Sequence, residues 1–119
     1  AGDLNRARQD LSDPETRATI LLALLGGPSK DQDRSLPDGF LVEMMDVREQ
    51  MEAAAAAGDR ARIEHWERWA NQQRAGHIRT VAEMFAGVDA TNPDPDALRA
   101  IRSRLNAWRY IERMLEQLA

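Results

Sequence analysis

Two histidines, His65 and His77, are the side chains of this sequence best suited to metal binding or proton transfer. They lie twelve positions apart within one predicted helix, so they cannot converge on a single metal ion. His77 falls on the apolar face of that helix and is expected to be a hydrogen-bonded core histidine. His65, beside Trp66, is expected at the surface. The sequence contains no cysteine, which excludes a disulfide and a thiolate ligand for zinc or an iron–sulfur cluster.

Carboxylates and arginines are numerous, but their spacing is that of ion pairs on helix surfaces. Glu64 with Arg68, and Glu112 with Arg109 or Arg113, are examples. Exposed pairs of this kind contribute only about 0.3–0.5 kcal/mol each. The sequence has no glycine-rich phosphate loop and no GxSxG, HExxH or EF-hand pattern. We therefore expect no catalytic site, no metal and no cofactor, and a protein that is not an enzyme.

Charge and hydropathy narrow the class of partner. The chain of 119 residues carries a net charge of −4, which is the wrong sign for a nucleic-acid binder. Four arginines on the last predicted helix could attract an acidic partner or RNA: Arg99, Arg102, Arg109 and Arg113. Glu112 and Glu116 interrupt this group, so the favoured interpretation is a solvated helix face. The longest apolar run, Ile20 to Leu25, is too short for a membrane span, so no membrane contact is expected.

Local signals predict where the first two helices begin and end. Asp13 can cap a short helix with Pro14 at its first position, and Gly26-Gly27-Pro28 ends that helix after Leu25. Residues 29–36 form a polar loop. A long helix is expected from about Asp38, with Pro37 near its first turn, through the alanine run at residues 53–57. Residues 1–10 have the spacing of the end of a further helix.

Two more long helices follow. Gly58 is a suitable C-terminal residue and Asp59 caps the next helix at once, which predicts a tight antiparallel hairpin. This helix is expected to end near Gly87. Asp94 and Pro95 then begin the last helix. No strand pattern is present, so the sequence predicts an all-α fold: a three-helix up-down-up antiparallel bundle preceded by a short linking helix.

Each long helix has one apolar face at helical spacing. The three predicted faces are Phe40, Met44, Val47 and Met51; Ile63, Trp66, Ala70, His77, Val81 and Met84; and Leu98, Ile101, Leu105, Trp108, Ile111, Leu115 and Leu118. Trp66 and Trp108 are expected to pack between helices, with Trp69 at the border. Gly76 costs about 1 kcal/mol relative to alanine inside a helix, and it is expected to allow close approach of a neighbouring helix.

One segment carries more apolar surface than a bundle needs. Leu41, Val42 and Met45 lie off the core face of their helix and are bordered by charged residues, namely Asp46, Arg48 and Glu49. Tyr110 and Met114 are similarly offset on the last helix, and Tyr110 would join the first group if the two helices are neighbours. Two interpretations remain open: a partner site with an aromatic hot spot, or a wide apolar arc that contacts two neighbouring helices.

Four stretches of the chain resemble the HscB family of J-type co-chaperones. Residues 11–17 resemble the end of the family's J domain, and residues 18–25 its short apolar link. Residues 40–51, FLVEMMDVREQM, are similar to the family's Phe-Leu-Met…Leu-Arg-Glu-Glu-Leu signature, with Val42 where the family has methionine. Residues 108–114 resemble its last-helix segment. The resemblance implies two parts: 1–13, a remnant of the J-domain end and linker, and 14–119, the C-terminal helical bundle.

The resemblance also implies a function. HscB proteins bind an IscU-like iron–sulfur cluster scaffold protein and deliver it to an HscA-type chaperone ATPase in the cytoplasm. The family's J domain stimulates that ATPase through a His-Pro-Asp tripeptide, which this sequence lacks. Carried over by position, the scaffold-binding residues are Leu41, Val42, Met45, Asp46, Arg48, Glu49 and Tyr110. The alternative is a structural or dimerisation module of a divergent J-domain protein outside iron–sulfur assembly, in which the patch pairs with itself in a homodimer.

Overall fold

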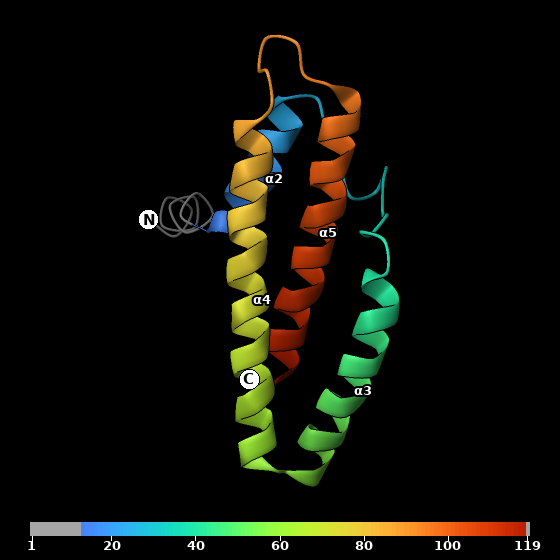
Figure 1. The fold of residues 1–119 in the computed structure, drawn as a ribbon, viewed down its shortest axis with the longest axis vertical. Coiled ribbons are helices and arrows are strands. Elements are labelled where there is room, and N and C mark those ends of the chain that lie inside the picture. Colours follow the sequence, from blue (N-terminus) through green and yellow to red (C-terminus); the bar gives the residue numbers. More distant parts are fainter. Residues whose placement is uncertain (1–12, 119) are drawn as a thin grey trace, which may run out of the picture.

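The structure, a computed structural model, describes residues 13–118. This part of the chain contains four helices (Figure 1). They are α2 (Pro14–Leu24), α3 (Phe40–Ala57), α4 (Arg60–Ala86) and α5 (Pro95–Leu118). The helix end predicted over residues 1–10 lies outside the described residues.

Side-chain caps begin three of these helices where the sequence predicts them. The Asp13 carboxylate accepts a hydrogen bond from the Thr16 backbone N–H at 3.3 Å, and Pro14 occupies the first turn of α2. Asp59 accepts from the Arg62 N–H at 3.2 Å at the start of α4. Asp94 accepts from the Asp96 N–H at 3.1 Å at the start of α5. The predicted starts of α2, α4 and α5 are therefore confirmed.

The start of α3 differs from the prediction by two residues. The helix begins at Phe40, so Pro37 and Asp38 lie before it. Gly39 has a φ of 77°, in the left-handed region, and no side chain caps the helix. A residue in that conformation cannot continue a right-handed helix, which is why the helix starts immediately after it.

The helices form the predicted up-down-up bundle with a short helix leading into it. α3 and α4 run in opposite directions on either side of the Gly58–Asp59 turn, and α5 returns beside α4 (Figure 1). α2 packs against α5 and α4 at the end of the bundle where the α4–α5 loop lies, and α3 packs on the same two helices toward the other end. The all-α class and this topology are confirmed.

The buried side chains form two clusters, and α5 contributes to both. One joins α2 to α4 and α5 through Ala18, Leu22, Val81, Leu98, Ile101, Leu105 and Trp108. The other joins α3 to the same pair through Phe40, Met44, Met51, Ala70, Ala107, Ile111 and Met114. Full burial of one large aliphatic side chain stabilises a fold by about 1.5–3 kcal/mol, so these clusters supply much of the packing energy. The predicted apolar faces are confirmed, although Val47, Ile63, Trp66, Met84, Leu115 and Leu118 are only half-buried.

One prediction about α4 is wrong, and one is confirmed only in part. A Cβ added at Gly76 would meet no neighbouring atom of the described residues within 4 Å, so no described helix approaches closely there. His77 is buried and lies edge-on to Phe40, with ring centroids 6.2 Å apart, but its Nε2 atom has no hydrogen-bond partner among the described residues. Packing against an aromatic ring, rather than a hydrogen bond, therefore holds this histidine in the core. His65 is exposed and Trp69 lies at the border, both as predicted.

Within residues 13–118, no helix is long and apolar enough to cross a membrane. The same part of the chain contains no group of three His, Asp or Glu side chains placed to hold a metal ion.

Candidate functional site

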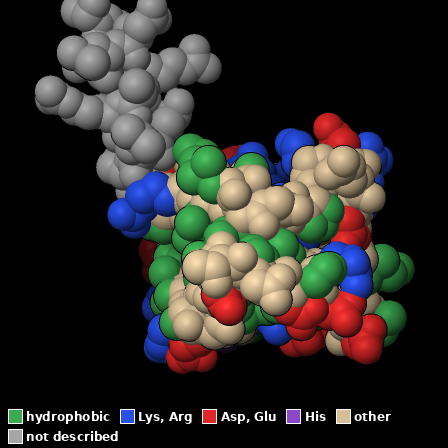
Figure 2. Space-filling view, turned by 90° about the horizontal axis from the view of Figure 1, so that it is seen from above, with side chains coloured by type: hydrophobic (Ala, Val, Ile, Leu, Met, Phe, Trp, Pro, Cys, Tyr) green, Lys and Arg blue, Asp and Glu red, His purple; other side chains and the backbone are tan. Residues whose placement is uncertain are grey.

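The first turns of α3 present two different apolar faces. Phe40 and Met44 are buried in the cluster with α4 and α5. On the opposite side, Leu41 is 50% exposed, Val42 76% and Met45 64%. Figure 2 looks at the molecule from above the view of Figure 1 and shows apolar side chains reaching the surface beside groups of charged ones. We call Leu41, Val42 and Met45 the α3 patch.

Charged side chains surround the α3 patch. Asp46, Arg48 and Glu49 are all exposed. The Arg48 Nε atom donates to the Glu52 carboxylate at 3.0 Å, and the Gln50 amide donates to Asp46 at 3.2 Å. Within the described residues Glu49 forms no ion pair. At the rim of the patch Arg48 is therefore paired with Glu52, whereas Asp46 and Glu49 form no ion pair with a described residue.

Tyr110 lies on α5, next to the first turns of α3. Its ring meets that of Phe40 edge-on, with centroids 5.7 Å apart, and the side chain is half-buried. Tyr110 and Arg48 line a shared cavity of about 230 Å³ together with Arg113, Met114 and Gln117. The hydrogen bond to Glu52, and after it the contact with Tyr110, raises the pKa of Arg48 above its ordinary value. Tyr110 and Arg48, predicted as site residues on separate helices, are thus neighbours.

The surplus apolar residues had two interpretations, a partner site or a wide apolar arc that contacts two neighbouring helices, and α3 and α5 differ in which one fits. On α5, Met114 is only 4% exposed and packs in the cluster with α3, so the wide apolar arc of this helix contacts two neighbours. On α3, neither α4 nor α5 covers Leu41, Val42 or Met45. Of these surplus residues, the three of the α3 patch are exposed, whereas Met114 is buried.

The ion pairs differ from those that the spacing predicts. Glu112 binds Arg74 of α4, with Nε at 2.5 Å and Nη2 at 2.8 Å, rather than Arg109 or Arg113. Arg109 pairs with Glu15 of α2 at 3.6 Å. Among the described ion pairs there is none between Glu64 and Arg68.

Arg102 also departs from the prediction. It is only 5% exposed, so the last-helix arginines do not form one solvated face. The reason is that the loop before α3 lies over this part of α5 and covers the side chain: Asn106, one turn further along, donates to the backbone carbonyls of Asp33 and Ser35.

A second exposed apolar group lies on α2 and was not predicted. Ile20 is 42% exposed, Leu21 41% and Leu24 79%, whereas Leu22 is 1% exposed. The sequence does contain a signal for it. Six consecutive apolar residues, Ile20 to Leu25, cannot all face one side of a helix with 3.6 residues per turn. Some of them must therefore point away from the bundle.

Comparisons with known proteins point to one family. Residues 36–119 match the family described as the HSCB C-terminal oligomerisation domain. A protein of Ralstonia nicotianae named co-chaperone protein HscB homolog is 30% identical over 98 residues, which are 82% of this chain and 56% of that protein. A protein of Vibrio cholerae with the same name is 40% identical over 60 residues, which are 50% of this chain and 35% of that protein.

The chain thus spans about half, or less, of the length of these curated relatives. No solved structure matches it significantly. The matched region contains α3, α4 and α5, the three long helices of the bundle, and it includes the α3 patch and Tyr110. The chain therefore belongs to the HscB family of co-chaperones, of which it contains the C-terminal domain.

Proposed function

We propose that this domain binds an IscU-like iron–sulfur cluster scaffold protein through the α3 patch and presents it to an HscA-type chaperone ATPase. Contact with the ATPase would be made by a J domain, whose His-Pro-Asp tripeptide residues 1–119 do not contain. The mechanism is docking and delivery without bond chemistry. A cytoplasmic location is part of the same proposal, and the lack of cysteine is compatible with a reducing compartment.

The observation that carries the proposal is the exposure of three large apolar side chains on one face of α3. Leu41, Val42 and Met45 are each at least half exposed, while the buried face of the same helix already anchors it to the bundle. Their apolar surface is therefore not needed for folding. Burying it against a partner removes it from water, which favours association.

The rim suggests the chemistry of the partner surface. Asp46 and Glu49 keep negative charge beside the patch, because the one nearby arginine, Arg48, is paired with Glu52. A scaffold surface with an apolar centre and basic residues around it would be complementary. Tyr110, edge-on to Phe40 and beside Arg48, offers a rigid aromatic side chain next to the first turns of α3, the kind of residue that often dominates interface energies.

A calorimetric titration with the IscU-like protein of the same organism tests this proposal. In the double variant Leu41→Ala/Met45→Ala we expect the affinity to fall at least a hundredfold, since truncation of one hot-spot residue commonly costs about 2 kcal/mol or more. The helical circular dichroism should not change, because both side chains are exposed.

Leu24→Ala is the matched control. It truncates a leucine that is 79% exposed on α2, away from the α3 patch, and it should leave the affinity unchanged. Equal affinity of wild type and double variant for the scaffold, or an equal loss in the control, would exclude the α3 patch as the docking surface.

Self-association is a second candidate, because the description of the matched family names oligomerisation. The α3 patch of one chain would then pack on the same patch of a second chain across a two-fold axis. Sedimentation velocity over a range of concentrations separates the two. A dimer dispersed by Leu41→Ala/Met45→Ala supports self-association, and a monomer that binds the scaffold supports docking.

A further inference from the structure

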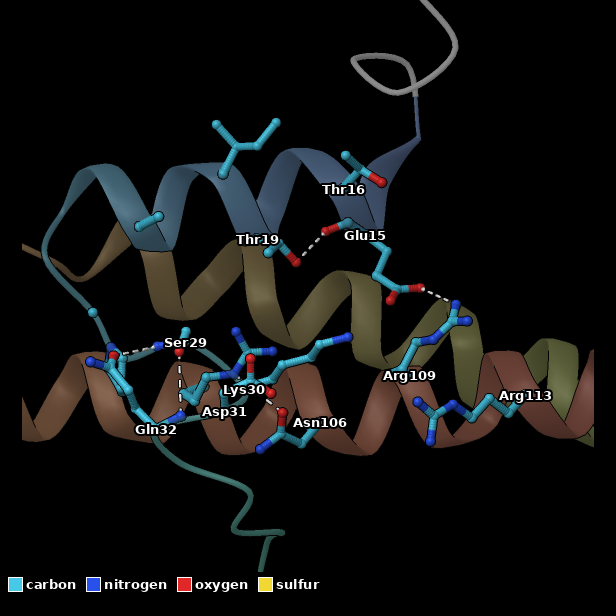
Figure 3. Close-up of a pocket in the computed structure, with 15 residues that line it drawn as sticks. Glu15, Thr16, Thr19, Ser29, Lys30, Asp31, Gln32, Asn106, Arg109 and Arg113 are labelled. Carbon is cyan, nitrogen blue, oxygen red and sulfur yellow. Dashed lines mark hydrogen bonds and ion pairs between the residues drawn. The ribbon is translucent and has the colours of Figure 1, made fainter. Parts of the chain in front are cut away.

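A cavity of about 620 Å³ opens between α2, the loop after it and α5 (Figure 3). It lies outside the α3 patch. Three elements enclose it: α2 from one side, the loop over residues 27–32 from another, and α5 along its length. Among the side chains that line it are four cations, Lys30, Arg102, Arg109 and Arg113.

The positive charge in this cavity exceeds the negative charge. Its two carboxylates are both paired with arginines, Glu15 with Arg109 at 3.6 Å and Asp31 with Arg34 at 3.9 Å. Within the described residues, Lys30, Arg102 and Arg113 have no carboxylate within ion-pair distance. Three cations without counter-ions thus line one cavity of a chain whose net charge is −4.

Arg102 is the most informative of the three. Its side chain is 5% exposed, and its only hydrogen bond to a described residue is from Nε to the Asn106 amide oxygen at 3.2 Å. Asn106 in turn donates to the backbone carbonyls of Asp33 and Ser35, at 3.0 and 2.8 Å. The loop therefore holds the pair Arg102–Asn106 in place. Burial of this cation without a counter-ion costs free energy, and a bound anion would recover it.

The remaining lining indicates what else the ligand contains. The volume is about twenty times the roughly 30 Å³ that one water molecule occupies, so it exceeds the size of a simple oxyanion. Ile20 and Ala23 of α2 and Pro28 of the loop add apolar surface to the same cavity. A ligand with a charged end and an apolar end would satisfy both kinds of lining.

We propose that this cavity binds a small soluble organic phosphate. The phosphate pairs with the guanidinium groups of Arg102 and Arg113 and with Lys30, and the organic part packs on Ile20. Phosphate monoesters suit this site because they carry close to two negative charges at neutral pH and because guanidinium groups bind phosphate oxygens in a bidentate manner. The proposal does not rest on scaffold docking, since its test contains no scaffold protein.

The test is a calorimetric titration of the 119-residue chain with phenyl phosphate and, separately, with inorganic phosphate. We expect phenyl phosphate to bind more tightly than inorganic phosphate, because only the former can use the apolar lining. Raising the salt from about 0.01 M to about 1 M shortens the Debye length from about 30 Å to about 3 Å and should greatly weaken binding.

Arg113→Gln is the diagnostic variant, because Arg113 is exposed and its loss should not disturb folding. We expect the affinity for phenyl phosphate to fall about tenfold, the effect of losing one hydrogen bond to a charged group. Arg79→Gln is the control: it removes the same charge from an exposed position of α4 that does not line the cavity. Amide NMR shifts at Lys30 and Arg113 should follow the titration.

Several results would overturn the proposal. These are the absence of phenyl phosphate binding at millimolar concentration, an equal loss in Arg79→Gln, or full affinity in Arg113→Gln. Co-sedimentation of the chain with vesicles of phosphatidic acid, without binding of phenyl phosphate, would likewise overturn it in favour of a lipid headgroup site. Arg102→Gln is a second test variant: once thermal unfolding shows that it folds, its affinity for phenyl phosphate should also fall.

Discussion

Arg74 of α4 and Glu112 of α5 form a two-point ion pair that joins the two helices. The Arg74 Nε and Nη2 atoms lie 2.5 and 2.8 Å from the two carboxylate oxygens of Glu112. The Trp108 indole N–H donates to the same carboxylate at 3.2 Å. The Arg74 hydrogen bond, with smaller help from that of Trp108, holds the pKa of Glu112 below its ordinary value. The pair therefore fixes one register of α4 against α5.

Breaking this pair should destabilise the bundle. We expect Arg74→Met to lower the free energy of unfolding by about 1–2 kcal/mol, because the Glu112 carboxylate keeps its burial but loses its cation. A double-mutant cycle with Glu112→Gln, followed by urea denaturation, should give a coupling energy of about 1 kcal/mol. The pair is partly exposed, which keeps that figure low. Strict additivity of the two substitutions would contradict the assigned contact.

The same contact gives a pH dependence of definite sign. The folded pKa of Glu112 lies below its ordinary 4.5, so the unfolded chain binds more protons as the pH falls. The stability that the pair supplies is present above pH 4.5 and is lost as the pH drops through the folded pKa.

The burial of His77 should make the stability of the fold depend on pH in a second, higher pH range. Burial, and then the nearby Arg104, lowers its pKa below the ordinary 6.5. Below pH 6.5 the unfolded chain therefore gains a proton that the folded chain does not, and stability falls with the pH until the folded pKa is reached. Thermal unfolding between pH 5 and pH 7.5, roughly the range in which histidine charge changes, measures this.

Two histidine variants identify the source of that effect. His77→Leu should remove the dependence at little cost in stability, because the Nε2 atom has no hydrogen-bond partner to lose in the described part of the chain. His65→Gln, at an exposed position of the same helix, should retain the dependence. A His77→Leu protein that still loses stability over the same range would show that another group is responsible.

Two glycine substitutions should act in opposite directions. Gly76 lies inside α4, and no neighbouring atom in residues 13–118 comes within 4 Å of an added Cβ, so Gly76→Ala should stabilise the fold by about 0.5–1 kcal/mol. Gly58 ends α3 with a φ of 63°, a left-handed conformation in which an L side chain is strained by about 1–2 kcal/mol. Gly58→Ala should therefore lower the unfolding midpoint in urea, and Gly76→Ala should raise it. A shift of the same sign in both would contradict these backbone assignments.

Residues close together in the chain settled most of the secondary structure. Asp13 with Pro14, and Gly58 with Asp59, mark helix boundaries through contacts within one turn, so they can be read without knowing the fold. The apolar faces are equally local, because 3.6 residues per turn decide which side chains share a side. The surplus apolar residues of α3 were predictable for the same reason. That they face away from both neighbouring helices was not, since this depends on where α4 and α5 lie.

Tertiary structure decided which charges meet. By spacing alone Glu112 could pair with Arg109 or Arg113 on its own helix, yet it binds Arg74, which is 38 positions away. An exposed pair one turn apart contributes too little energy to compete with a two-point contact between packed helices. Arg102 has the spacing of a surface residue and becomes buried only because the loop before α3 lies over it. Helix faces follow from the periodicity of one segment, whereas the partners across them follow from the register in which the segments pack.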